Sequence, residues 1–273
     1  MSVSEQNRSP FEQILLTDDR PPSPGKLSVS LTFARRALLK IRYQPEQLLD
    51  VTFFPVLMTL MFTYLFGGAL AGSTGKYLQF LIPGILVQTV IFTTVFTGVA
   101  LNTDISKGVN DRIRSMPVWS PAPLVGGLLA DAVRYTMASV IVLIIGLILG
   151  YRPTANLPAI LAAIVLVLIF AFSLSWAFTT IGLIMKTSAA VMGISMTLLL
   201  PFTFVSNILV SPATMPAWLR AFVNVNPVSL LTTAVRELLS GTFSVVSIAW
   251  VLLASAIFII IFAPLTMRFY RNK

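Results

Sequence analysis

The sequence contains no cysteine and no histidine. These absences exclude disulfide bonds, thiolate nucleophiles, most zinc sites and every imidazole general base. The chain also lacks the G-x-x-x-x-G-K-[ST] motif of a phosphate-binding loop, so it cannot hydrolyse ATP by P-loop chemistry. A membrane enzyme is therefore disfavoured, and any ATP-driven work requires a partner chain.

Charged residues are also scarce. They make up 11% of the 273 residues, whereas hydrophobic residues make up 56% and the mean hydropathy is +0.87. This composition leaves too little polar surface to cover a soluble globule. The apolar runs are long enough for helices to cross a hydrocarbon core about 30 Å thick, and too long for barrel strands of about 10 residues. We therefore expect an all-α integral membrane protein.

Six apolar segments have the length of transmembrane helices, and together they define a membrane domain over residues 51–267. Before this domain, residues 1–26 are polar and turn-rich and lack the apolar core of a signal peptide, so we expect a flexible tail. Residues 268–273 form a short basic C-terminus. The predicted spans are 51–70, 77–101, 124–150, 157–185, 189–210 and 245–267.

Residues 27–45 have the pattern of a basic amphipathic helix that ends at Pro45. Apolar residues recur at spacings of three and four, and basic residues occupy the other faces. Such a helix lies in the headgroup layer, where its cations contact anionic lipid. The cations expected to do so are Arg35, Arg36, Lys40 and Arg42.

Residues 102–120, named here the coupling segment, carry the densest charge cluster after residue 50. Burial of its ionised side chains would cost roughly 2.5–3.5 kcal/mol per charge near the bilayer centre, so the segment must be a loop or a surface helix. It either joins two spans and does nothing more, or it is a docking site for a cytosolic motor. The ionised residues are Asp104, Lys107, Asp111, Arg112 and Arg114.

Six spans place both termini on the same side of the membrane. That side would carry fourteen lysines and arginines, against four on the other side. By the positive-inside rule, both termini and the coupling segment face the cytoplasm. The same rule accounts for the net charge of +9, so we expect no nucleic-acid partner.

Residues 212–241 predict two short helices that dip into the outer membrane surface without crossing it. Asn226 and Pro227 have the pattern of an N-cap followed by proline at the first helical position, and Gly241 lies where a C-terminal cap belongs. We expect these helices to be re-entrant and to precede the sixth span.

Two groups of residues within the spans are candidates for function. Asp131 and Arg134 are neighbours on one helix, which favours an interface-level ion pair over a proton relay. Hydroxyl groups in spans commonly bond to their own helix, but some could line a substrate path. The candidate path residues are Thr93, Phe96, Thr203 and Asn207.

The chain resembles the ABC-2 type permeases, and among them the daunorubicin-resistance kind of multidrug and lipid exporters, from about residue 28 onward. The first specific stretches are Asp111–Pro117 and Leu129–Arg134. The later ones are Met215–Leu219, Asn226–Pro227 and Arg236–Gly241.

The resemblance implies a half-transporter of the bacterial cytoplasmic membrane, with an elbow helix, six spans, a coupling helix and re-entrant outer helices. Two permeases, identical or related, would pair with two copies of a separate ATPase that binds ATP and Mg. This chain itself would hold no cofactor, metal or catalytic residue. Arg112 and Arg114 would make charge-assisted bonds to the ATPase, and Met116 and Pro117 would pack into an apolar groove. The full set of expected ATPase contacts is Asp104, Lys107, Asp111, Arg112, Arg114, Met116 and Pro117.

The cargo stays open between two classes: an amphipathic drug or lipid, which leads, and a polysaccharide or lipid-linked saccharide. A self-sufficient secondary carrier is a further alternative. It would require intramembrane carboxylates as coupling sites, and Asp131 is the single candidate and has its own arginine.

Overall fold

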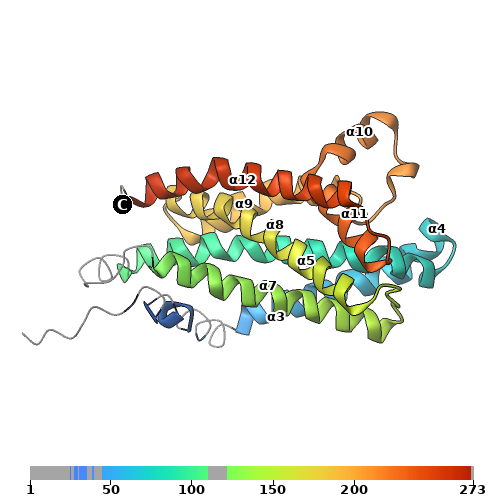
Figure 1. Cartoon of the computed structure of the whole chain (residues 1–273), viewed down its shortest axis with the longest axis horizontal. Helices are drawn as coiled ribbons and strands as arrows, with labels where there is room; N and C mark the ends of the chain where they lie inside the picture. Colours follow the sequence, from blue (N-terminus) through green and yellow to red (C-terminus); the bar gives the residue numbers. More distant parts are fainter. Residues whose placement is uncertain are drawn as a thin grey trace, which may run out of the picture.

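The computed structural model describes residues 45–109 and 122–271, together with residues 25, 28–29, 31–35 and 39. These residues form helices and turns and contain no strand, which confirms the predicted all-α class (Figure 1). A π-helical turn at Phe62–Phe66 joins α3 to α4, and a 3₁₀ turn at Pro212–Thr214 precedes α10. The α-helices are α3 (Pro45–Met61), α4 (Gly67–Ala71), α5 (Thr74–Ser106), α7 (Ala122–Leu149), α8 (Leu157–Ile184), α9 (Ser188–Phe204), α10 (Ala217–Val225), α11 (Pro227–Leu239) and α12 (Val245–Arg271).

Five stretches of the described chain are long and apolar enough to cross a membrane. They correspond to the predicted first, second, third, fourth and sixth spans. Their bounds are Phe53–Ala71, Thr74–Ser106, Gly126–Leu149, Leu157–Ile184 and Val245–Tyr270.

The predicted fifth span differs from the structure. Its helix, α9, has 17 residues and ends at Phe204, so it is about 25 Å long at 1.5 Å per residue. Residues 205–210, predicted to continue the helix, are not helical. The Nδ2 of Asn226 donates to the carbonyls of Phe202 and Val205, both over 2.7 Å, and so satisfies carbonyl oxygens that a longer helix would have bonded.

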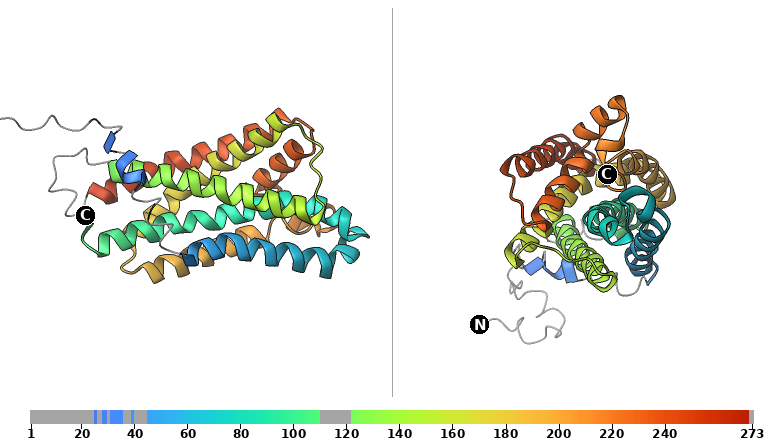
Figure 2. Two further views of the ribbon diagram at one scale, coloured as in Figure 1. Left: turned by 90° about the horizontal axis from the view of Figure 1, so that it is seen from below. Right: turned by 90° about the vertical axis from the view of Figure 1, so that its right-hand side faces the viewer.

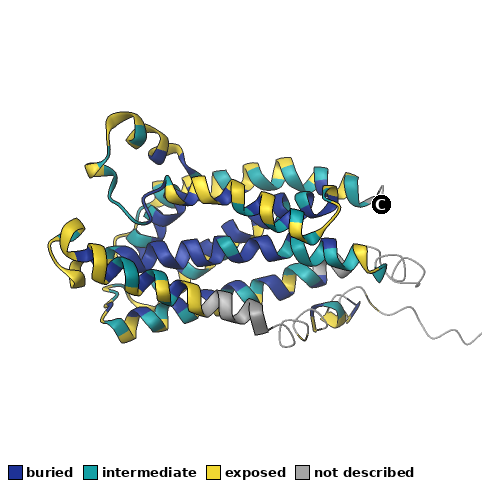
Figure 3. Ribbon diagram, turned by 180° about the vertical axis from the view of Figure 1, so that it is seen from behind, coloured by how far each residue is buried: buried dark blue, intermediate teal, exposed yellow. Residues whose placement is uncertain are grey.

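α5 is the central helix of the bundle. In its most apolar stretch 78% of the residues are buried, against 11–39% in the other four long helices. It contacts α3, α4, α7, α8, α9 and α11, and it is the most continuously buried helix in Figure 3. A helix that is apolar on all sides belongs in such a position, because its neighbours cover every face.

The helices run along a common direction and give the bundle two distinct ends (Figures 1 and 2). One end, named here the terminal end, holds the C-terminus of α12, the end of α5 and the described N-terminal residues. The opposite end, named the far end, holds α4, α10 and α11.

Several predicted boundaries shift in the structure. Pro45 is the first residue of α3 rather than the last of the amphipathic segment, and α12 continues past residue 267 to Arg271. Residues 102–106, placed in the coupling segment, are the last part of α5. Asn102 holds this part in the bundle, because its buried Nδ2 donates to the carbonyls of Gly182 and Met185 over 2.8 Å each.

The two short helices of residues 212–241 are present but have different environments. α11 is packed against α5, α8 and α12, and Asn226 caps its start by accepting from Val228 N over 2.9 Å. α10 projects from the far end of the bundle (Figure 1), and Trp218 and Val225 on it are each 74% exposed. The expected C-terminal cap at Gly241 has φ +78°.

Candidate transport pocket and polar sites

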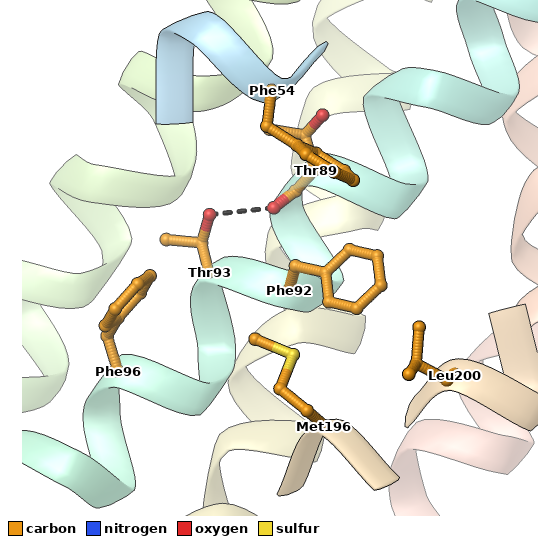
Figure 4. Close-up of a pocket in the computed structure, with 7 residues that line it drawn as sticks. All are labelled: Phe54, Thr89, Phe92, Thr93, Phe96, Met196 and Leu200. Atoms are coloured by element: carbon orange, nitrogen blue, oxygen red, sulfur yellow. Dashed lines mark hydrogen bonds between the residues drawn. The ribbon is translucent and has the colours of Figure 1, made fainter. Parts of the chain in front are cut away.

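A cavity of about 310 Å³ opens between α3, α5 and α9 (Figure 4). α5 contributes two threonines and two phenylalanines to its wall. α3 adds a third phenylalanine, Phe54, whose ring meets that of Phe92 edge-on at 6.1 Å. The lining residues are Phe54, Thr89, Phe92, Thr93, Phe96, Met196 and Leu200.

The lining of this pocket is apolar and aromatic, with two hydroxyl groups. Thr89 donates to the carbonyl of Ile85 and Thr93 donates to that of Thr89, each over 2.7 Å. Their hydroxyl protons are therefore committed to α5, and only oxygen lone pairs remain for a ligand. The residues that line the pocket carry no ionised group, so the wall suits an amphipathic or aromatic molecule.

The structure divides the four predicted path residues into two pairs. Thr93 and Phe96 line the pocket. Thr203 is buried and donates to the carbonyl of Leu199 over 2.9 Å, and Asn207 is bonded to α11. Neither of the second pair is among the lining residues.

Five lining residues are not among the four predicted path residues: Phe54, Thr89, Phe92, Met196 and Leu200. On α5 a signal was available, because residues 89, 92, 93 and 96 follow the spacing of a single helical face. Nothing comparable marks residues 54, 196 and 200, which reach the pocket only through the packing of α3 and α9 on α5.

Asp131 and Arg134 form an ion pair on α7, with Nη1 of the arginine 3.1 Å from Oδ1 of the aspartate. Thr97 on α5 donates to the other carboxylate oxygen over 2.6 Å, and its oxygen lies 3.1 Å from the Tyr135 hydroxyl. Asp131 and Tyr135 are buried. The pair is therefore part of a polar contact that joins α5 to α7 inside the bundle.

Replacing Asp131 with alanine is expected to destabilise the protein by about 3–5 kcal/mol, because it leaves the Arg134 cation in the bundle without its partner. The measurement is thermal unfolding of the purified chain in detergent. The control is Asp131→Asn combined with Arg134→Gln, which removes both charges and should recover much of the loss. Equal instability of the single and double variants would show that charge pairing is not the cause.

Most of the predicted ATPase contacts, Asp111, Arg112, Arg114, Met116 and Pro117, lie outside the described residues. Asp104 is half-buried near the end of α5, and Lys107 directly follows the helix and is exposed. Of the predicted headgroup cations, Arg35 is exposed on a helical stretch at the terminal end, and Arg36, Lys40 and Arg42 lie outside the described residues.

The far end has a polar cluster around the turn between α7 and α8. Gln79 donates to the carbonyl of Gly150 and accepts from the backbone N of Arg152, both over 3.2 Å. Burial raises the pKa of the Tyr151 hydroxyl to about 12, although the nearby charge of Arg236 opposes this effect. The phenol is therefore uncharged at physiological pH. In the described part of the chain, no group of three or more acidic side chains could hold a metal ion.

Comparison with known proteins gives a consistent result. The family model described as "ABC-2 type transporter" matches residues 30–240. The chain is 45% identical over 260 residues to the daunorubicin resistance ABC transporter permease protein DrrB1 of Streptomyces coeruleorubidus, covering 95% of this chain and 92% of that protein. It is 26% identical over 189 residues to the doxorubicin resistance ABC transporter permease protein DrrB of Mycobacterium tuberculosis, covering 69% of this chain and 65% of that protein.

A further relative is the putative transport permease ycf38 of Porphyra purpurea, 26% identical over 229 residues and covering 79% of this chain and 77% of that protein. The family match extends over most of the membrane domain, and the 45% identity extends over nearly the whole chain. Both agree with the apolar helical bundle described above. The chain therefore belongs to the ABC-2 type transporter family and is a multi-pass membrane permease subunit of an ABC exporter.

Proposed function

We propose that the chain exports an amphipathic drug or lipid from the cytoplasm or inner leaflet, and that the pocket between α3, α5 and α9 is part of the cargo path. The observation that carries the proposal is the wall of the pocket, which offers three phenylalanine rings and two hydroxyl acceptors. Aromatic, apolar molecules with a few hydrogen-bond donors match such a wall. The similarity to a permease named for daunorubicin resistance supports the same cargo class.

The energy for export comes from a separate ATPase subunit. In the proposed complex, two copies of that subunit bind ATP and Mg and dock on the coupling segments of two permeases, identical or related. This chain contributes no catalytic residue, metal or cofactor. The absence of a phosphate-binding motif supports this division of labour.

α5 provides a direct mechanical route from the ATPase to the pocket. It is one uninterrupted helix that contains pocket residue Thr93 and, eleven residues later, Asp104 of the coupling segment. At 1.5 Å per residue these positions are about 16 Å apart along the axis. A push on the coupling segment would therefore move the pocket wall without passing through a flexible joint.

The proposed layout has six spans, with α9 and residues 205–211 together forming a broken fifth span. Non-helical backbone is tolerated at membrane depth where protein surrounds it, and Ser206, Asn207 and Ile208 are buried. The elbow helix, the coupling helix and both termini face the cytoplasm of a bacterial cell, and α10 and α11 are re-entrant from outside. The sequence has fourteen lysines and arginines in the segments assigned to the cytoplasmic side and four in those assigned to the other side, which supports this orientation.

Photo-cross-linking tests the proposed path. A photoreactive amino acid at residue 93 or 96 is expected to label an amphipathic drug analogue, because both positions line the pocket. The matched control for residue 93 is residue 203, which is also a buried threonine but lies outside the lining. Excess unlabelled drug should abolish labelling at 93 and 96. Equal labelling at residues 93, 96 and 203, or at residue 203 alone, would place the path elsewhere.

A further inference from the structure

Arg236 of α11 joins α5 to the segment that follows α9. Its Nε and Nη2 donate to the carbonyl of Phe80 over 3.3 and 3.1 Å, and Nη2 also donates to the carbonyl of Asn207 over 3.2 Å. The guanidinium carbon lies 3.8 Å from the centroid of the Phe80 ring, so a cation–π contact adds to the bonds. One side chain from a third helix thus ties two other elements together.

The two elements are the continuations of the pocket walls toward the far end. Phe80 lies twelve residues from Phe92 along α5, about 18 Å at 1.5 Å per residue. Asn207 lies seven residues beyond Leu200 of α9. Arg236 therefore bonds the continuations of α5 and α9, and both bonded residues lie on the far-end side of the pocket.

The same two elements are also in backbone contact, at Gly84 on α5 and at Ile208 beside Asn207. A Cβ at Gly84 would lie 2.8 Å from the carbonyl oxygen of Ile208 and 3.1 Å from its Cα. Ile208 is completely buried, and the Tyr77 hydroxyl donates to the carbonyl of Leu209 over 2.8 Å. Because residue 84 has no side chain, the backbones of α5 and of residues 205–211 can approach each other this closely on the far-end side of the pocket.

α11 is also bonded to the segment after α9 through Asn207. Ser229 accepts from the backbone N of Asn207 over 3.2 Å, and Thr233 accepts from its Nδ2 over 2.8 Å. Arg236 is one turn further along the same helix. A water molecule can replace Arg236 as the donor to a carbonyl oxygen. Asn207 would still be bonded to α11 through Ser229 and Thr233, so the bonds between Arg236 and Phe80 are the exchangeable part of this junction.

We propose that Arg236 is a far-end latch that positions the pocket walls: its bonds to Phe80 and Asn207 keep the Gly84–Ile208 contact closed, and cargo leaves toward α10 and α11 when the bonds to Phe80 break. This inference rests on the proposed function, because it takes the pocket as the cargo site. It assigns to α11 the role of holding the exit closed between transport events.

The absence of native cysteine allows a direct test in the complete transporter in intact cells. The reporter is Thr93→Cys, at a buried pocket position, and the probe is a membrane-impermeant maleimide added outside. Arg236→Met, which keeps the length and loses the bonds, is expected to raise the labelling rate about tenfold or more. Arg236→Lys, which can keep one bond, should give a smaller increase.

Arg220→Met is the matched control. Arg220 also holds carbonyls at the far end, those of Pro212, Ala213 and Met215, but it joins residues of one loop rather than the two pocket walls. It should leave the labelling rate of Thr93→Cys unchanged. A second reporter, Trp218→Cys on exposed α10, should react from outside in every background.

If the maleimide labels Thr93→Cys at an unchanged rate in both Arg236 variants, while the transporter is still in the membrane, the latch is overturned. Equal increases of this labelling rate in the Arg220 and Arg236 variants would also overturn it, because they would indicate general loosening of the bundle. Failure of Trp218→Cys to react with the external probe would overturn the exit direction. A faster rate at residue 93 without drug cross-linking at residues 93 and 96 would leave the latch standing and reject the proposed cargo path.

Discussion

Replacing Arg112 or Arg114 with glutamate is expected to abolish drug-stimulated ATP hydrolysis by the reconstituted transporter while the permease remains inserted. Each arginine is expected to make charge-assisted bonds to the ATPase, and such bonds contribute about 1.5–3 kcal/mol each. Charge reversal removes them and adds repulsion, so docking should weaken by about 10- to 100-fold or more. The measurements are ATPase activity with and without drug and co-purification of the ATPase subunit.

The control for this experiment is Arg220→Glu. This variant makes the same charge reversal at the far end of the bundle, on α10, and should retain stimulation. Full stimulation in both the Arg112 and Arg114 variants would remove the coupling segment from the mechanism.

Replacing Gly98 or Gly182 with alanine is expected to produce a large loss of stability. A Cβ at Gly98 would lie 2.8 Å from the carbonyl carbon of Phe178 and closer to its oxygen, and one at Gly182 would lie 3.0 Å from the carbonyl carbon of Gly98. The obstacle is backbone on both sides, so α5 and α8 must separate. Overpacking of this kind costs about 1–3 kcal/mol or more, and unfolding in detergent should begin about 5–10 °C lower.

The matched control is Gly193→Ala in the interior of α9, where a Cβ would have no neighbour within 4 Å. Alanine there should be neutral or stabilise by about 0.5–1 kcal/mol, because it favours the helix. The crossing also involves Asn102, which donates to the Gly182 carbonyl. Unaltered unfolding of the Gly98 and Gly182 variants would mean that α5 and α8 do not approach this closely.

The long helices could be predicted from hydropathy because each one is apolar over its whole length. α7 and α8 begin and end within two residues of the predicted spans, and Asn156, with Pro158 close behind it, marks the start of α8. α9 could not be predicted in the same way. The side chain that satisfies its last carbonyls is Asn226, more than twenty residues away, and hydropathy carries no information about that contact.

Only part of the pocket could be predicted for a related reason. Thr93 and Phe96 lie on a face of one helix, which periodicity can identify. Met196 and Leu200 reach that face because α9 packs on α5, and this packing is a tertiary property. Thr203 and Asn207 are polar, as a path residue can be, but in the structure Thr203 bonds its own helix and Asn207 bonds α11.

The most direct test of the account is drug accumulation in inverted membrane vesicles containing this chain with or without the ATPase subunit. We expect accumulation that requires both chains and hydrolysable ATP, and that is lost in the Arg112→Glu variant. Accumulation driven by an ion gradient in vesicles with this chain alone and no nucleotide would contradict the account, because the chain would then be a self-sufficient carrier.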